Sequence, residues 1–134
     1  MDVSSGVTGP RWLFAYGTLG PSDVREAVRE GWQDDAVRGR LYDLGPYPAL
    51  IDWEDSTAGW VEGHVRSVEP IELIEVFDPY EGVGDGQFRR VTLRTLRGRE
   101  AWVYVFPHPV PAWALGPLTR WEGPRINLSR IDGR

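Results

Sequence analysis

Residues 12–19 read WLFAYGTL, an apolar run that stops at a glycine. A short continuous apolar run is consistent with a strand buried on both faces, which we place over residues 12–16. Gly17 lets the backbone approach a ligand closely, and the consecutive N–H groups that follow could bind a carboxylate or a developing oxyanion. The alternative interpretation is an ordinary strand end that binds nothing.

Short elements continue along the chain. The pattern predicts helices over 23–30 and from 70 to about 78, and strands over 36–44, 49–51, 60–68, 88–96 and 101–106. Strands that alternate apolar and polar residues, mixed with two helices, are typical of an α+β fold. We expect a small mixed β-barrel or a strongly curved sheet with flanking helices, and not a doubly wound parallel sheet.

Capping and breaking residues set the limits of both predicted helices. The first helix has an apolar stripe of Val24, Ala27 and Val28. The second begins at Pro70, because proline suits the first helical position. It is expected to end near Asp78, because proline at position 79 disfavours helix in the residue before it. Asp78 is therefore interpreted as a helix-end residue.

The chain has 134 residues, which suits one domain. We expect a flexible leader over residues 1–10, the folded domain over 11–109, and an irregular C-terminal tail over 110–134 that packs on the domain. The start does not resemble a signal peptide, and no apolar segment reaches membrane-spanning length. The expected location is cytoplasmic, with no membrane partner.

Composition excludes several kinds of chemistry. The chain has no cysteine and no lysine, so thiolate catalysis, disulfides and Schiff bases are excluded. The two histidines, His64 and His108, lie far apart in sequence, and we expect no metal and no cofactor. A net charge of −5 without a basic run predicts no nucleic-acid binding.

A second candidate site is the turn at residues 77–82, which reads FDPYEG. Glu81 follows a helix end and is surrounded in sequence by Phe77, Tyr80 and Phe88. A carboxylate among aromatic rings loses solvation, which raises its pKa and allows proton exchange near neutral pH. The alternative is a surface glutamate in a turn.

In combination, these segments resemble a known family. Residues 14–19, 41–49 and 77–82, with Gly63 and the strand start at 88–91, are similar in order and context to the γ-glutamylcyclotransferase-like superfamily, in its avirulence-induced-gene-type branch. The likeness runs from about Trp12 to Phe106. It implies a β-barrel with flanking helices. It also implies an enzyme that releases 5-oxoproline from a small γ-glutamyl amine or amino-acid derivative without a cofactor.

The resemblance also implies roles for individual residues. Glu81 matches the general acid/base, which takes a proton from the attacking amine and gives it to the leaving amine. The substrate-binding residues that it implies or allows are Tyr16, Gly17, Thr18, Leu19, Tyr47 and Phe88. Of these, Tyr47 is equally well explained by turn packing.

One position departs from the family pattern. Many members have tyrosine where this chain has Phe88, so a hydroxyl contact to the substrate is lost, worth roughly 1.5–3 kcal/mol if the contact is to a charged group. Arg89 or Arg90 could face the pocket and compensate.

Phe88 also favours a rival interpretation, a non-catalytic module that binds a small molecule or a partner. A third is another acyl- or amide-transforming enzyme on the same scaffold. The sequence indicates neither the leaving group nor the oligomeric state.

Overall fold

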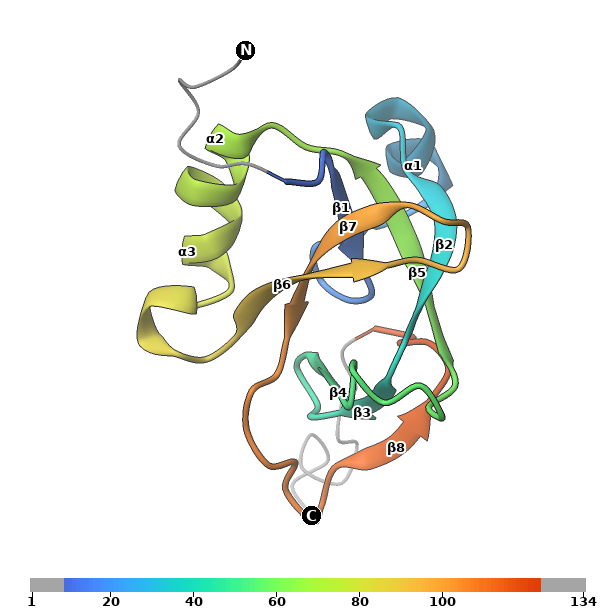
Figure 1. Ribbon diagram of the computed structural model, residues 1–134, viewed down its shortest axis with the longest axis vertical. Helices are drawn as coiled ribbons and strands as arrows, with labels where there is room; N and C mark the ends of the chain where they lie inside the picture. Colours follow the sequence, from blue (N-terminus) through green and yellow to red (C-terminus); the bar gives the residue numbers. More distant parts are fainter. Residues whose placement is uncertain (1–8, 124–134) are drawn as a thin grey trace, which may run out of the picture.

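The computed structural model describes residues 9–123, which form two sheets and a set of short helices (Figure 1). The predicted leader lies outside this range except for residues 9 and 10, as does the end of the predicted tail. The elements are β1 (Trp12–Ala15), α1 (Val24–Glu30), β2 (Gln33–Arg38), β3 (Arg40–Asp43), β4 (Pro48–Ile51), β5 (Trp60–Ser67), α2 (Pro70–Glu72), a π-helical turn (Leu73–Phe77), α3 (Asp78–Tyr80), a 3-10 turn (Val83–Asp85), β6 (Arg89–Arg94), β7 (Glu100–Val105) and β8 (Leu115–Leu118).

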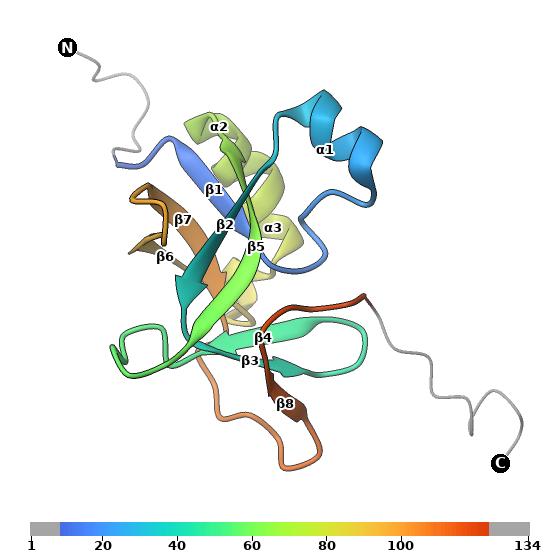
Figure 2. The same ribbon diagram turned by 90° about the vertical axis from the view of Figure 1, so that its right-hand side faces the viewer.

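The larger sheet has the strand order β2-β5-β1-β7-β6, and the smaller one has the order β4-β3-β8. β1 lies in the middle, antiparallel to β5 and parallel to β7. The small sheet lies at one end of the large one (Figure 2). The mixed α+β prediction is confirmed, whereas the strand pairs of residues 9–123 form no closed barrel.

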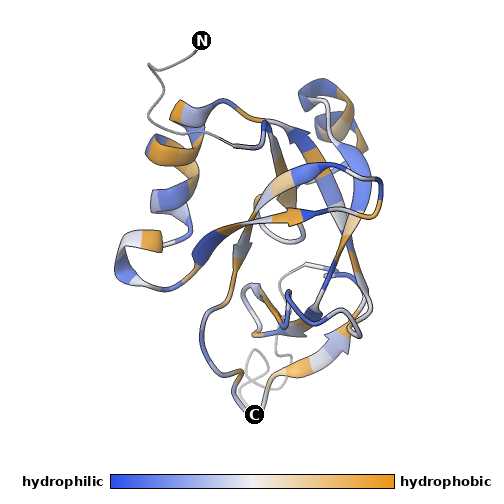
Figure 3. Ribbon diagram, in the orientation of Figure 1, coloured by the Kyte–Doolittle hydropathy of each residue, from blue (hydrophilic) through white to orange (hydrophobic). Residues whose placement is uncertain are grey.

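The core is built on both faces of β1, as its sequence predicts. Leu13 contributes to one buried cluster and Phe14 to the other, and both side chains are buried. The cluster around Phe14 also includes residues of β2, β5 and β7, and the ribbon coloured by hydropathy shows apolar segments in the centre of the sheet (Figure 3). β1 therefore joins the two halves of the core.

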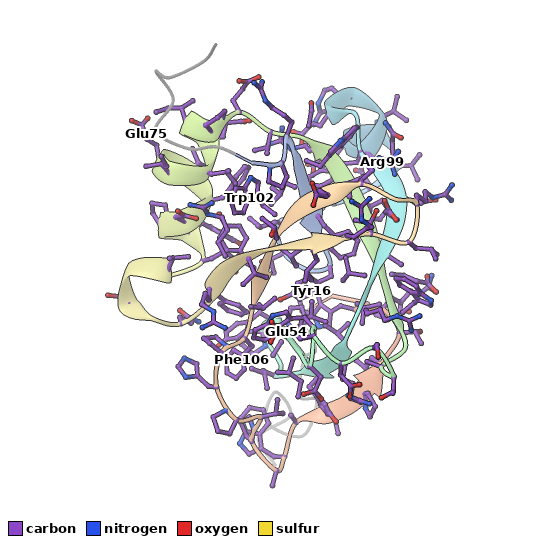
Figure 4. The ribbon with its side chains drawn as sticks, viewed as in Figure 1. Tyr16, Glu54, Glu75, Arg99, Trp102 and Phe106 are labelled. Carbon is purple, nitrogen blue, oxygen red and sulfur yellow. The ribbon has the colours of Figure 1, made fainter. Side chains whose placement is uncertain are left out.

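A buried carboxylate fastens the free edge of the larger sheet. Asp35, in β2, accepts hydrogen bonds from the backbone N–H of Ala36 (2.8 Å) and of Arg97 (3.0 Å) and from Nη1 of Arg99 (2.8 Å). Arg99 lies beside β2 in Figure 4. Burial alone would raise the pKa of Asp35, but these hydrogen bonds and one from Thr95 hold it below its usual value. The tip of the β6–β7 hairpin is thereby tied to β2, where the Leu96 N–H also donates to the Ala36 carbonyl (2.8 Å).

The second helix ends close to the predicted position, at Tyr80 instead of near Asp78, but Pro79 does not end it. Helical backbone continues through Asp78 and Pro79 to Tyr80, passing through the π-helical turn. A π turn shifts the hydrogen-bonding pattern, which accommodates a proline that has no N–H to donate. As a consequence, Asp78 lies inside the helical segment and Glu81 forms its C-cap.

The apolar stripe predicted for α1 lies at the surface, because Val24 and Val28 are 78% and 77% exposed. The predicted tail is not irregular throughout, since residues 115–118 form β8 and pair with β3. None of the helices among residues 9–123 is long and apolar enough to cross a membrane.

A close contact between β5 and β1 predicts the outcome of one substitution. A Cβ at Gly63 would lie 2.6 Å from Cζ of Phe14 and would also collide with the Ala15 carbonyl oxygen. We expect Gly63→Ala to lower the free energy of unfolding by about 1–3 kcal/mol, because the obstruction includes backbone. Chemical denaturation measures this change. The control is Gly59→Ala, where a Cβ would meet nothing within 4 Å, and equal stability of the two variants would contradict the prediction.

Candidate functional site

A single open pocket gathers all seven residues that were predicted as catalytic or substrate-binding. It lies where β1 ends and has an empty volume of about 320 Å³, counting its open mouth. The lining residues are Phe14, Ala15, Tyr16, Gly17, Thr18, Leu19, Tyr47, Pro48, Glu81, Phe88 and Tyr104. Segments that are more than 60 residues apart in sequence, at Gly17 and Glu81, therefore face the same space.

The glycine at position 17 is required by packing. A Cβ there would lie 2.6 Å from Cγ of Pro48 and 3.6 Å from Cε3 of Trp121. The loop then turns tightly, because the Gly20 N–H donates to the Gly17 carbonyl (2.9 Å). The backbone of residues 17–19 is thereby held against one wall of the pocket.

Glu81 is positioned by the end of the helical segment. Its N–H donates to the Phe77 carbonyl (2.9 Å), which keeps the residue in the last turn. Burial raises the pKa of its carboxyl from 4.5 to about 7, because desolvation disfavours the charged form. A carboxyl with this pKa exchanges protons readily at neutral pH.

Two tyrosines in the pocket keep their protons. Burial raises the pKa of Tyr16 well above its ordinary value of 10.0, and the charge of Glu81 adds to the shift. Burial also raises the pKa of Tyr104, with a further contribution from its hydrogen bond to Asp78. The Tyr16 hydroxyl donates to the Tyr104 carbonyl at 2.5 Å. Tyr16, Glu81 and Tyr104 are the pocket residues with a shifted pKa, and that of Glu81 lies nearest to 7.

The sequence did not indicate Tyr104, and it indicated Asp78 chiefly as a helix-end residue. In the structure the Tyr104 hydroxyl donates to Oδ1 of Asp78 (2.6 Å). Arg90 donates to both carboxylate oxygens of Asp78, from Nε (2.8 Å) and from Nη2 (3.1 Å). The available signal was a tyrosine in an otherwise apolar strand, which indicates a buried hydroxyl in need of a partner.

The pocket wall around Phe88 is aromatic. Phe88 is buried, and its ring packs edge-on against Tyr47 (5.8 Å between centroids) and Phe106 (5.6 Å). The idea that Arg89 or Arg90 faces the pocket is wrong. Arg89 lies over the ring of Trp53 and Arg90 over that of Trp102, at 5.5 and 4.4 Å from the centroids, and neither lines the pocket.

The histidines lie away from this pocket. Nε2 of His64 is 3.2 Å from Oδ1 of Asp34, and Nε2 of His108 is 2.6 Å from the Gly86 carbonyl oxygen. In the described part of the chain, no group of three His, Asp or Glu side chains gathers as a metal ion would require.

A wider groove adjoins the pocket and shares Ala15, Tyr16 and Gly17 with it. One side of the groove is formed by residues that follow β8, namely Arg120, Trp121 and Glu122. The C-terminal segment therefore shapes the space next to the glycine loop.

Fold and pocket together define a small α+β protein with a desolvated carboxyl facing a glycine loop. The model of the family described as "Gamma-glutamyl cyclotransferase, AIG2-like" matches residues 13–123, and the chain belongs to this family. It is 31% identical over 99 residues to a Vibrio cholerae protein named "Putative gamma-glutamylcyclotransferase", covering 70% of this chain and 80% of that protein.

Solved structures show the same fold. An AIG2-like protein of Mus musculus has a TM-score of 0.54 at 20% identity, with 87% of this chain and 92% of that one covered. An Arabidopsis thaliana protein has a TM-score of 0.56 at 20% identity, with 89% and 81% covered. At this identity the likeness concerns the fold alone.

The raised pKa of Glu81 predicts how stability depends on pH. Between pH 4.5 and about 7 the folded chain holds a proton that the unfolded chain has released, so this carboxyl destabilises the fold increasingly as pH rises. Glu81→Gln stays neutral at every pH. We therefore expect its free energy of unfolding to exceed that of wild type by about 3 kcal/mol at pH 8 and to equal it at pH 4.

Denaturant titrations of both proteins at the two pH values measure this difference. The matched control is Glu75→Gln, since Glu75 is exposed and points away from the body of the molecule (Figure 4). A stability difference at position 81 that is the same at both pH values would show that burial of a charge is not the cause.

Proposed function

We propose that this protein releases 5-oxoproline from a small γ-glutamyl amine or γ-glutamyl amino-acid derivative. The observation that carries the proposal is Glu81, a carboxyl with a pKa of about 7 in the same pocket as the glycine loop. Membership of the γ-glutamyl cyclotransferase family supports it.

In the proposed reaction the α-amine of the substrate attacks its own γ-carbonyl carbon. A carbon–nitrogen bond forms within a five-membered ring, and the bond from that carbon to the leaving amine breaks. Glu81 accepts the proton from the attacking nitrogen and transfers it to the departing nitrogen, so the net proton balance is zero. Nucleophile and electrophile belong to one molecule, which removes much of the entropic cost.

The loop at residues 17–19 has the second role in this proposal. As the carbonyl carbon becomes tetrahedral, its oxygen gains negative charge, which backbone N–H groups stabilise in a poorly solvated site. Tyr16, Tyr47 and Phe88 would enclose the glutamyl part. The chemistry requires no redox step and no electrophile beyond these donors, so we propose a cofactor-independent reaction.

The adjoining groove would receive the leaving group. It opens from the same residues, Ala15 to Gly17, and is several times larger than the pocket. A leaving group of varied size could therefore extend away from the reacting atoms without entering the aromatic wall around Phe88.

One observation favours a second function. The wall at Phe88 offers no hydroxyl, so the pocket lacks one hydrogen-bonding group that many relatives would provide. A binding module that holds a small acidic metabolite without turnover would keep the same pocket. Ligand-induced thermal stabilisation without product would indicate this function.

The direct test is release of 5-oxoproline from a panel of γ-glutamyl amino acids, γ-glutamyl amines and glutathione. We expect wild type and Glu75→Gln to release it from at least one compound. Glu81→Gln should lose at least about 100-fold in rate, as expected for removal of a general acid/base. Undiminished release by Glu81→Gln, with its fold intact by circular dichroism, would exclude this mechanism.

The pH dependence of kcat/KM provides an independent prediction. Glu81 must be ionised to accept the amine proton, so kcat/KM should rise with pH to a midpoint near 7 and fall about tenfold per unit below it. Initial rates between pH 4 and 8 measure the midpoint. The same midpoint is expected for Glu75→Gln, whereas a midpoint near 4.5 would mean that the base is a solvated carboxylate.

A further inference from the structure

The Tyr104 hydroxyl has a fixed direction of hydrogen bonding. Tyr104 is 2% exposed, and its hydroxyl lies 2.6 Å from Oδ1 of Asp78. Asp78 also accepts two N–H groups of Arg90, one on each carboxylate oxygen, in a bidentate pair. An ionised carboxylate only accepts hydrogen bonds, so the proton of Tyr104 must point at Asp78.

The remaining capacity of this hydroxyl is therefore that of an acceptor. A phenolic oxygen that donates its proton can still accept a hydrogen bond. Among residues 9–123, no protein group donates to the Tyr104 oxygen, although Tyr104 lines the pocket and senses the charge of Glu81.

Tyr16 provides the contrast within the same pocket. Its hydroxyl donates to the Tyr104 carbonyl, and the nearby backbone of Leu50 acts to lower its pKa. The Tyr16 hydroxyl is thus directed at a backbone carbonyl, whereas the Tyr104 hydroxyl is directed at a carboxylate that is itself held by Arg90. Tyr104 is therefore the tyrosine of this pocket whose hydroxyl direction is set by an ion pair.

We propose that Tyr104, oriented by Asp78 and Arg90, binds the α-amino group of the substrate by accepting one of its N–H groups. This inference rests on the proposed function, because that function brings an amine beside Glu81. An amine or ammonium group has several N–H donors, and Glu81 and Tyr104 offer two acceptors from different elements. With two of its N–H groups directed in this way, the attacking nitrogen is oriented relative to the γ-carbonyl.

In this assignment Tyr104 is a binding residue, and Asp78 and Arg90 are positioning residues. Without Asp78 the hydroxyl could rotate and present its proton to the pocket, where an ammonium group would find a donor instead of an acceptor. The ion pair between Asp78 and Arg90 therefore favours a ligand that donates a hydrogen bond to the Tyr104 oxygen.

The test compares two compounds that differ only in the α-amine. The probes are γ-glutamylmethylamide and glutaric acid monomethylamide, and binding is measured by calorimetry or ligand-observed NMR in the Glu81→Gln background, which prevents turnover. We expect this background to bind the amino compound more tightly than its counterpart. Adding Tyr104→Phe should weaken binding of the amino compound about 10-fold and that of its counterpart less than 2-fold.

The matched control is Tyr80→Phe in the same background, since Tyr80 is exposed and does not line the pocket. It should change neither affinity. Loss of both affinities to the same degree on adding Tyr104→Phe, no loss at all, or absence of binding by either compound would overturn the assignment. A merely structural role of the hydroxyl would affect both compounds equally, so the selectivity distinguishes the two cases.

This outcome is separate from that of the proposed function. Selective binding that depends on Tyr104 would support the amine site even if no member of the γ-glutamyl panel were converted to 5-oxoproline. Turnover without such selectivity would support the proposed reaction and contradict the assignment of Tyr104 as the residue that binds the amine.

Discussion

The ion pair between Asp78 and Arg90 links the helical segment to the sheet at the point where the site is formed. Arg90 belongs to β6, and Asp78 lies three residues before Glu81 in the last helical turns. Both side chains are largely buried, and the guanidinium of Arg90 also rests on the ring of Trp102. Removing one partner of a buried pair typically costs 3–5 kcal/mol, because it leaves the other charge uncompensated. This link helps to hold Glu81 near β1 and β7, since the backbone N–H of Glu81 donates only locally, to the Phe77 carbonyl.

The same poorly solvated pocket has opposite consequences for the groups inside it. It raises the pKa of Glu81 to about 7, so that ionisation of this carboxyl costs stability, and it keeps the protons on Tyr16 and Tyr104. Glu81 therefore changes its charge near pH 7, whereas Tyr16 and Tyr104, in the same pocket, stay uncharged. Desolvation raises the pKa of both kinds of acid. The pKa of a carboxyl thereby moves up towards 7, whereas the pKa of a phenol, which already lies near 10, moves further above 7.

Local signals in the sequence predicted much of the architecture, and the family resemblance supplied most of the residues that line the pocket. The apolar run at 12–16 and the alternation at 60–68 correspond to β1 and β5, and the candidate residues from Tyr16 to Phe88 share one pocket. The catalytic and binding roles of those residues stay predictions. The failures have another origin. Pro79 was expected to stop a helix, but a π turn absorbs the defect, and only the three-dimensional hydrogen bonding reveals that solution.

Long-range partners could not be predicted either. Asp35 looks like any acidic strand residue, and its role depends on the tip of a hairpin more than 60 residues away. Tyr104 lacked a recognisable motif because its partner, Asp78, approaches from another element. The strand β8 is short and contains glycine and proline, so its pairing with β3 has no periodic signal.

The central position of β1 has a consequence for the order in which the chain can fold. Residues 12–15 leave the ribosome before both of their neighbouring strands, of which one begins at Trp60 and the other at Glu100. During synthesis this strand must wait, with both apolar faces and its hydrogen-bonding edges unpaired, until most of the chain has emerged. Such a segment can pair with other chains in the meantime, so nascent or truncated forms that end before β7 would carry the greatest aggregation hazard of this fold.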